Sequence, residues 1–199
     1  MKRSDIISFF IDKFKYKTYL EIGVDRGLTF NDIKIDSKIS VDPGDGRYSH
    51  AKPTYKVTSD EFFENICKEK RFDIIFIDGL HHSDQVDKDI KNSLNVLNLN
   101  GMILLDDVNP LQEEYQIVPR QKGGYWNGDV WKSIVQYRNE SNSFGCVSYQ
   151  VDENITFSFI KETIQSNFSL QVPSELTYSW FNENRKDALG LMDDFRSIQ

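Results

Sequence analysis

The sequence predicts an α/β protein with a doubly wound, mostly parallel sheet, helices on both faces and an antiparallel hairpin at the sheet edge. Four short apolar segments, typical of buried parallel strands, alternate with polar segments of helical periodicity. Further along the chain, two segments alternate apolar and polar side chains around a tight turn, as antiparallel strands do. The 199 residues suit a single domain, 1–199.

Local patterns give the order of the elements. The first 15 residues form an amphipathic helical pattern, with Ser4 or Asp5 as the expected N-cap. The spacing of apolar side chains predicts helices over 60–70 and 83–97. We expect strands at 18–24, 38–42, 72–78 and 101–107, hairpin strands at 146–152 and 155–162, a helix in GDVWKSIVQYR, and a partly helical tail over 174–199.

The amino-acid composition limits the kinds of molecule that the protein is expected to bind. The chain has 24 Lys and Arg against 31 Asp and Glu, a net charge of −7 that disfavours a surface for nucleic-acid phosphates. No apolar run approaches the roughly 20 residues that cross a bilayer, and the start lacks a signal-peptide pattern. Two scattered cysteines indicate a reducing compartment. We expect a cytoplasmic protein that binds a small molecule, without nucleic-acid or membrane partners; the edge hairpin or the tail could support a homodimer.

Three of the predicted strands end in acidic residues: Asp42, Asp78, and the pair Asp106 and Asp107. Open α/β sheets bind ligands beyond the carboxyl ends of their strands, so these carboxylates are expected to converge on one site. Asp42 also fits a second role, because an Asp-Pro-Gly sequence favours a turn.

A glycine-containing turn follows the first strand, in YLEIGVDRGLTF. Gly23 and Gly27 would let the backbone approach a ligand closely, although a tight strand-to-helix turn explains them equally well. Their spacing departs from G-x-G-x-x-G, which disfavours a nicotinamide dinucleotide. Asp42, about twenty residues further on, could accept both hydroxyls of a ribose.

Together these motifs resemble the class I S-adenosylmethionine-dependent methyltransferases, which have a Rossmann-like fold. E-x-G-x-x-x-G matches their first motif as Glu21, Gly23 and Gly27, and Asp42 matches the acidic end of strand two. FDIIFIDG and LNLNGMILLDDV match the motifs of strands four and five. The resemblance covers roughly residues 15–108.

The resemblance implies S-adenosylmethionine (SAM) as the cofactor. It assigns the methionine portion of SAM to Gly23 and its neighbours, Glu21 and Gly27 included, and the ribose to Asp42. It also places Ser59 or Asp60 near the adenine, although Asp60 could equally be a helix N-cap.

The remaining acids suggest a divalent cation. The sulfonium of SAM is already reactive and needs no carboxylate cluster, whereas Mg²⁺ or another hard divalent cation takes oxygen ligands. Asp78, Asp106 and Asp107 would repel one another without a cation, so a bound metal would remove an electrostatic cost. Paired aspartates also cap helices or face solvent, which leaves a structural alternative open.

His81 follows Asp78 by three residues and could take a proton from an acceptor hydroxyl. D-G-x-H followed by an acidic pair resembles the metal-dependent sugar O-methyltransferases of macrolide antibiotic pathways, which implies metal ligation by Asp78, Asp106 and Asp107 and a base role for His81. His82 is the substitute base or acceptor contact, and either histidine could instead be an ordinary surface group.

The segment 109–131 lacks a clear period and contains several Pro and Gly residues, which is typical of a functional loop or lid. Tyr125 and Trp126 offer flat faces for stacking on an acceptor ring. Val130 and Trp131 are better explained as the start of a core helix capped by Asp129.

The sequence therefore predicts an O-methyltransferase that uses SAM and a divalent cation and acts on a small-molecule hydroxyl, in particular a saccharide or glycoside. A metal-independent N- or O-methyltransferase is the alternative enzyme, and full activity in chelator would favour it. A module that binds a nucleoside or sugar without catalysis is the alternative from another class. Cofactor binding without methyl transfer would distinguish it.

Overall fold

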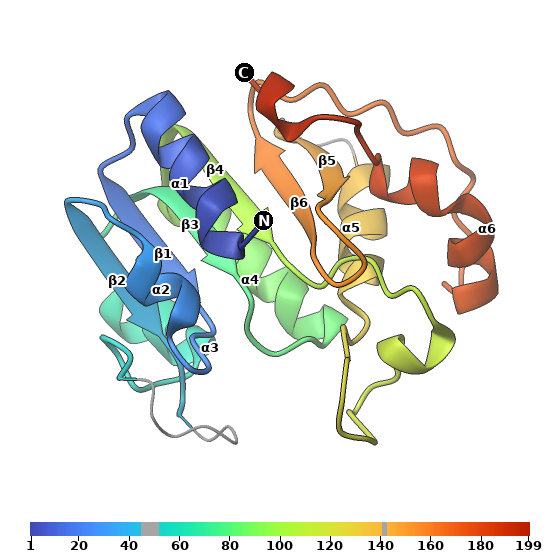
Figure 1. Ribbon diagram of the computed structural model, residues 1–199, viewed down its shortest axis with the longest axis horizontal. Helices are drawn as coiled ribbons and strands as arrows, with labels where there is room; N and C mark the ends of the chain where they lie inside the picture. Colours follow the sequence, from blue (N-terminus) through green and yellow to red (C-terminus); the bar gives the residue numbers. More distant parts are fainter. Residues whose placement is uncertain (45–51, 141–142) are drawn as a thin grey trace. The chain divides into compact units, whose positions relative to one another are not determined.

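The computed structural model describes residues 1–44, 52–140 and 143–199. Six strands form one sheet in the order β2-β1-β3-β4-β6-β5 (Figure 1). β1 pairs in parallel with β2 and β3, whereas β5 and β6 are antiparallel, so the predicted α/β class with an antiparallel edge hairpin is confirmed. The strands are β1 (Thr18–Ile22), β2 (Ser37–Val41), β3 (Phe72–Ile77), β4 (Leu97–Leu105), β5 (Gly145–Gln150) and β6 (Thr156–Lys161).

The described helices vary in length and type. The α-helices are α1 (Arg3–Phe14), α2 (Leu28–Asp32), α3 (Ser59–Glu61), α4 (Ser83–Val96), α5 (Val130–Asn139) and α6 (Tyr178–Leu189). A π-helix, η1 (Phe62–Ile66), and two 3-10 helices, η2 (Glu113–Gln116) and η3 (Phe195–Ser197), complete the set. Within the described ranges, no helix is both long and apolar enough to cross a bilayer.

The chain divides into two compact units. The first contains Met1–Leu80 and Lys88–Leu104, and the second contains His81–Asp87 and Leu105–Gln199. The single domain over 1–199 stays a prediction.

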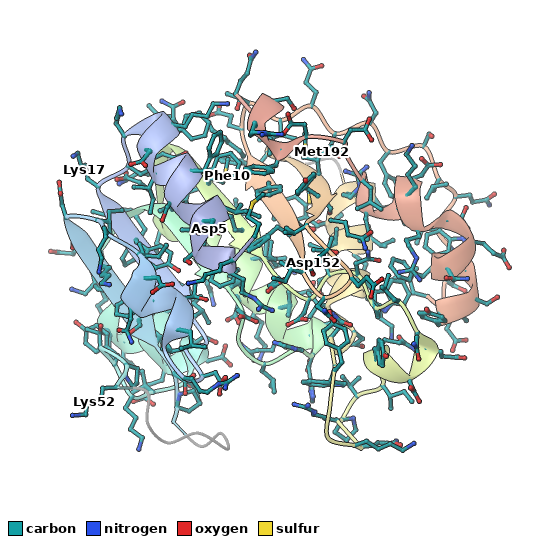
Figure 2. All side chains as sticks on the ribbon, in the orientation of Figure 1. Asp5, Phe10, Lys17, Lys52, Asp152 and Met192 are labelled. Atoms are coloured by element: carbon teal, nitrogen blue, oxygen red, sulfur yellow. The ribbon has the colours of Figure 1, made fainter. Side chains whose placement is uncertain are left out.

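In the first unit, α1 buries one face completely. Ile6, Ile7 and Phe10 are inaccessible to solvent, as the helical spacing predicts (Figure 2 labels Phe10 and Asp5 on this helix). The predicted N-cap is wrong, because α1 begins at Arg3 and Lys2 occupies the N-cap position. The Asp5 carboxylate accepts a hydrogen bond from the Lys2 backbone N–H at 2.8 Å. Asp5 therefore stabilises the helix start from inside the first turn.

The helix predicted over 60–70 is shorter and wider than expected. Helix α3 passes directly into η1, where the Cys67 N–H donates to the Phe62 carbonyl at 2.8 Å. This five-residue spacing widens the turn and keeps Phe62 and Cys67 buried. β4 also begins earlier than the predicted strand, at Leu97.

In the second unit, β5 and β6 form the predicted hairpin. Asp152, labelled in Figure 2, stabilises its turn by accepting from the N–H groups of Asn154 and Ile155 at 2.8 and 3.0 Å. The predicted helical segment of the tail is α6, which packs Phe181 against Trp131 with ring centroids 4.4 Å apart. Both side chains are fully buried, so they form part of this unit's core.

A buried acid lies in β1 of the first unit. Glu21 is 2% exposed and accepts a hydrogen bond from the Tyr19 hydroxyl at 2.5 Å. Burial raises the pKa of the Glu21 carboxyl from 4.5 to about 8, the Tyr19 hydrogen bond opposes the rise, and the Asp78 carboxylate adds to it. Glu21 therefore retains its proton at neutral pH in the folded protein.

Gly23 is held where no side chain fits. Its φ is +83°, and an added Cβ would lie 2.0 Å from the Asp78 backbone oxygen. We expect Gly23→Ala to lower the free energy of unfolding by about 3 kcal/mol, since the left-handed conformation and the overlap both cost energy. Urea unfolding measures the loss, with Gly27→Ala as the matched control. Gly27 has a similar φ of +74°, but the nearest atom to its added Cβ would be in the Asn31 side chain, at 3.2 Å. Equal losses in the two variants would contradict this account.

The raised pKa of Glu21 predicts a pH-dependent stability. Between pH 4.5 and about 8 the unfolded chain ionises Glu21 while the folded protein keeps the proton, so stability falls as pH rises. The effect is on the order of a few kcal/mol, at about 1.4 kcal/mol per pKa unit. Glu21→Gln stays neutral and should remove this fall, which urea unfolding at pH 5 and pH 8 would detect. Parallel stability curves for the two proteins would refute the role of Glu21.

Candidate active site

The residues assigned to the cofactor lie in the first unit. Gly23 follows β1, and its N–H donates to the Val41 carbonyl of β2 at 2.9 Å. Asp42 accepts from the N–H groups of Val24 and Asp25 through one oxygen, at 2.8 and 3.2 Å, and from Gly44 through the other, at 2.7 Å. Asp42 thus joins the loop after β1 to the turn after β2, and its ribose role stays a prediction.

Thr58, rather than Asp60, caps α3. The Thr58 hydroxyl accepts from the Glu61 N–H at 3.2 Å, which makes the capping alternative for Asp60 wrong. Asp60 lies in the first turn and forms a surface ion pair with Lys88 at 3.2 Å. The assignment of Ser59 or Asp60 to the adenine stays a prediction.

Asp78 follows β3 directly and belongs to the first unit. Its N–H donates to the Ile22 carbonyl of β1 at 2.8 Å, which continues the parallel ladder. Its carboxylate lies 3.9 Å from the Arg3 Nε in an ion pair with partly exposed side chains. The Arg3 guanidinium therefore partly balances the negative charge of Asp78. The metal role of Asp78 stays a prediction.

The second unit brings His81 and Asp107 together. The His81 Nε2 lies 3.4 Å from the Asp107 Oδ2, and the two side chains are 17% and 8% exposed. Asp107 has a φ of +58°, a left-handed conformation that aspartate tolerates better than most residues. Asp107 lies two residues after the end of β4, so the chain changes direction at the residue that contacts His81. Asp106 is also buried, and its metal role stays a prediction.

Trp126 packs flat against the predicted base. Its ring lies 5.1 Å from the His81 ring at an interplanar angle of 15°, and His82 meets it edge-on at 6.3 Å. The indole N–H donates to the Ile117 carbonyl at 2.7 Å, which fixes the ring. Trp126 therefore orients His81, whereas stacking of Trp126 on an acceptor stays a prediction.

Sequence reasoning overlooked Asn127. This buried side chain donates from Nδ2 to the Asp107 Oδ1 at 2.9 Å and lies 3.3 Å from the Tyr125 hydroxyl. Tyr125 in turn donates to the Asn154 carbonyl at 2.6 Å, so its hydroxyl is engaged within the unit. The Asn-Gly-Asp sequence after two aromatic residues was the available signal for a tight functional turn.

Asp129 is the predicted N-cap residue of α5, but its carboxylate binds the start of another helix. It occupies the N-cap position of α5, but its side chain makes no cap hydrogen bond there. Its carboxylate instead accepts from the Ser83 N–H at 2.7 Å and from the Ser83 hydroxyl at 3.1 Å, at the start of α4. Trp131 is fully buried, which confirms the core assignment of this helix start.

Comparisons with known proteins show what part of the chain is similar to. Residues 20–108 match the family model of a methyltransferase domain, a stretch that runs from within β1 to just beyond β4. Comparison with curated proteins gives no match.

Several solved methyltransferases share the fold. An O-methyltransferase from Bacillus cereus in complex with S-adenosylhomocysteine (SAH) has a TM-score of 0.58 and 12% identity, over 80% of each chain. The O-methyltransferase TomG from Streptomyces achromogenes, involved in tomaymycin synthesis, has a TM-score of 0.57 and 11% identity, over 80% of this chain and 78% of its own. The SAH-bound methyltransferase PaMTH1 from Podospora anserina has a TM-score of 0.53 and 17% identity, over 80% and 77%. The sheet order and the family match agree: residues 20–108 are similar to a methyltransferase domain, and the chain shares the fold of these methyltransferases.

Proposed function

We propose that the protein transfers a methyl group from SAM to a hydroxyl oxygen of a small acceptor, in particular a saccharide or glycoside, with His81 as the base and a divalent cation as the activator. The observation that carries the proposal is the His81–Asp107 pair, 3.4 Å apart and largely shielded from water. The names of structurally similar proteins, O-methyltransferases from Bacillus cereus and Streptomyces achromogenes among them, support oxygen as the methylated atom.

The proposed reaction is a single displacement. SAM supplies a methyl group that its sulfonium makes electrophilic. The acceptor oxygen attacks this carbon, the new C–O bond forms as the C–S bond breaks, and the hydroxyl proton passes to His81. The products are the methyl ether, SAH and a proton, which the imidazole releases to solvent. The main contribution of the protein is therefore orientation and deprotonation.

The donor set fits a hard divalent cation. Asp78, Asp106 and Asp107 offer carboxylate oxygens, which Mg²⁺ prefers, and His81 follows Asp78 by only three residues in the sequence. Asp107 is buried, and a buried carboxylate is stabilised by a nearby positive charge. A bound cation would lower the pKa of the acceptor hydroxyl and so ease its loss of a proton to His81.

Metal removal tests the activator. We expect SAH to bind in calorimetric titrations with Mg²⁺ or chelator alike, while methyl transfer is lost in chelator and returns on adding Mg²⁺. Asp107→Asn keeps the side-chain size and tolerates the left-handed backbone but loses the charge, so we expect about 100-fold lower turnover with little change in SAH affinity. Asp42→Ala should instead mainly weaken SAH binding. Normal turnover in chelator would refute the metal part, and no SAH binding would overturn the whole proposal.

Replacement of the base tests the proton transfer. We expect His81→Asn to lower kcat by about 10²- to 10⁴-fold, since a positioned base contributes that much, while the KM for SAM changes little. His82→Asn is the matched comparison, because it alters the neighbouring histidine in the same way. A larger loss in His82→Asn would assign the base to His82, and full activity in both variants would exclude His81 and His82 as the base.

A further inference from the structure

Both oxygens of the Asp107 carboxylate are engaged within the second unit. Oδ2 lies 3.4 Å from the His81 Nε2, and Oδ1 accepts a hydrogen bond from the Asn127 Nδ2 at 2.9 Å. We infer that Asn127 is the positioning residue of this site, which holds the Asp107 carboxylate so that Oδ2 faces His81. The inference rests on the proposed function for its catalytic consequence.

The hydrogen-bond chain fixes which end of the Asn127 amide faces Asp107. An amide oxygen in that place would meet a carboxylate oxygen, two acceptors in contact, so the NH₂ group must face Asp107. The Tyr125 hydroxyl donates to the Asn154 carbonyl, which leaves it able to accept from the second hydrogen of Nδ2. Each Nδ2 hydrogen thus has a partner, and the amide plane is set by two contacts.

The backbone around Asn127 is tied to the backbone of His81. The N–H groups of Asn127 and Gly128 donate to the Tyr115 carbonyl at 2.9 and 3.1 Å, and the Asp129 N–H donates to the His81 carbonyl at 3.2 Å. Gly128 has a φ of +65°, and an added Cβ would lie 1.9 Å from the His81 carbonyl oxygen. The turn that carries Asn127 and the residue that carries the imidazole are therefore positioned together.

This arrangement explains why a neutral amide suits position 127. A carboxylate held on both sides keeps one orientation about its Cβ–Cγ bond, whereas loss of the Asn127 donor removes one of the two contacts. The neutral amide also adds no charge to a buried site that already contains an acid. Asn127 acts through Asp107, so it is expected to affect the rate rather than cofactor binding.

Two variants and one matched control test the inference. Asn127→Asp keeps the size and removes the donor, and Asn127→Ala removes the donor without adding charge. Asn154→Asp makes the same chemical change at the other end of the hydrogen-bond chain, where only the backbone carbonyl accepts. Urea unfolding verifies that each variant folds, and agreement between the Asp and Ala variants separates loss of the donor from added charge.

The first measurement is the NMR signal of the His81 imidazole at one fixed pH, without cofactor or metal. The chain has three histidines, so His50→Asn and His82→Asn assign the signals. We expect the His81 signals to shift in both Asn127 variants and to stay in place in Asn154→Asp. In turnover assays, kcat should fall by about 10- to 100-fold in the Asn127 variants with an unchanged KM for SAM.

The outcomes separate this inference from the proposed function. Unchanged His81 signals in both Asn127 variants would overturn the inference, whether or not the protein transfers methyl groups. A raised KM for SAM with unchanged kcat would overturn it too. Shifted signals in a protein that transfers no methyl group to any acceptor would support the positioning role of Asn127 and overturn the proposed function instead.

Discussion

The parallel register of β1 between β2 and β3 is the constraint on which the first unit depends. Ile22 at the end of β1 is level with Val41 in β2 and with Ile77 in β3. The residues that follow these three positions are Gly23, Asp42 and Asp78, so three chain segments leave the sheet at one edge. Nearly all residues of β1 and β3 are buried, so a shift of one residue in either strand would misplace packed side chains, and burial of the core fixes this edge as well.

Close backbone packing at that edge has a direct chemical consequence. Gly23 lies so near the Asp78 backbone that a Cβ would overlap it, and Asp42 accepts three backbone N–H groups from the two neighbouring loops. The loops are therefore shaped by the protein's own hydrogen bonds, so a ligand that binds at this edge would meet backbone that is already ordered. The buried Glu21, two residues before Gly23, is neutral and so adds no charge beside this turn.

In the second unit, contacts between side chains fix the position of the imidazole. The polar chain of this unit runs from His81 through Asp107, Asn127 and Tyr125 to the Asn154 carbonyl, and Trp126 lies flat on the imidazole. Each member restricts the next one, so the rotamer of the imidazole is specified by groups far from it in sequence. A side chain on a loop needs such support because loop backbone alone does not fix it.

The sequence by itself determined the strand and helix order, the glycine turn after β1 and the acids at the strand ends, because these depend on local periodicity and on backbone conformations that few residue types adopt. It failed where local and tertiary demands differ: the expected helix over 60–70 became α3 and a π-helix that buries Phe62 and Cys67. Only the tertiary structure decided the partners of the site residues. Asn127 meets Asp107 across 20 positions and Asp129 meets Ser83 across 46, and no local pattern encodes a hydrogen bond between side chains that only folding brings together.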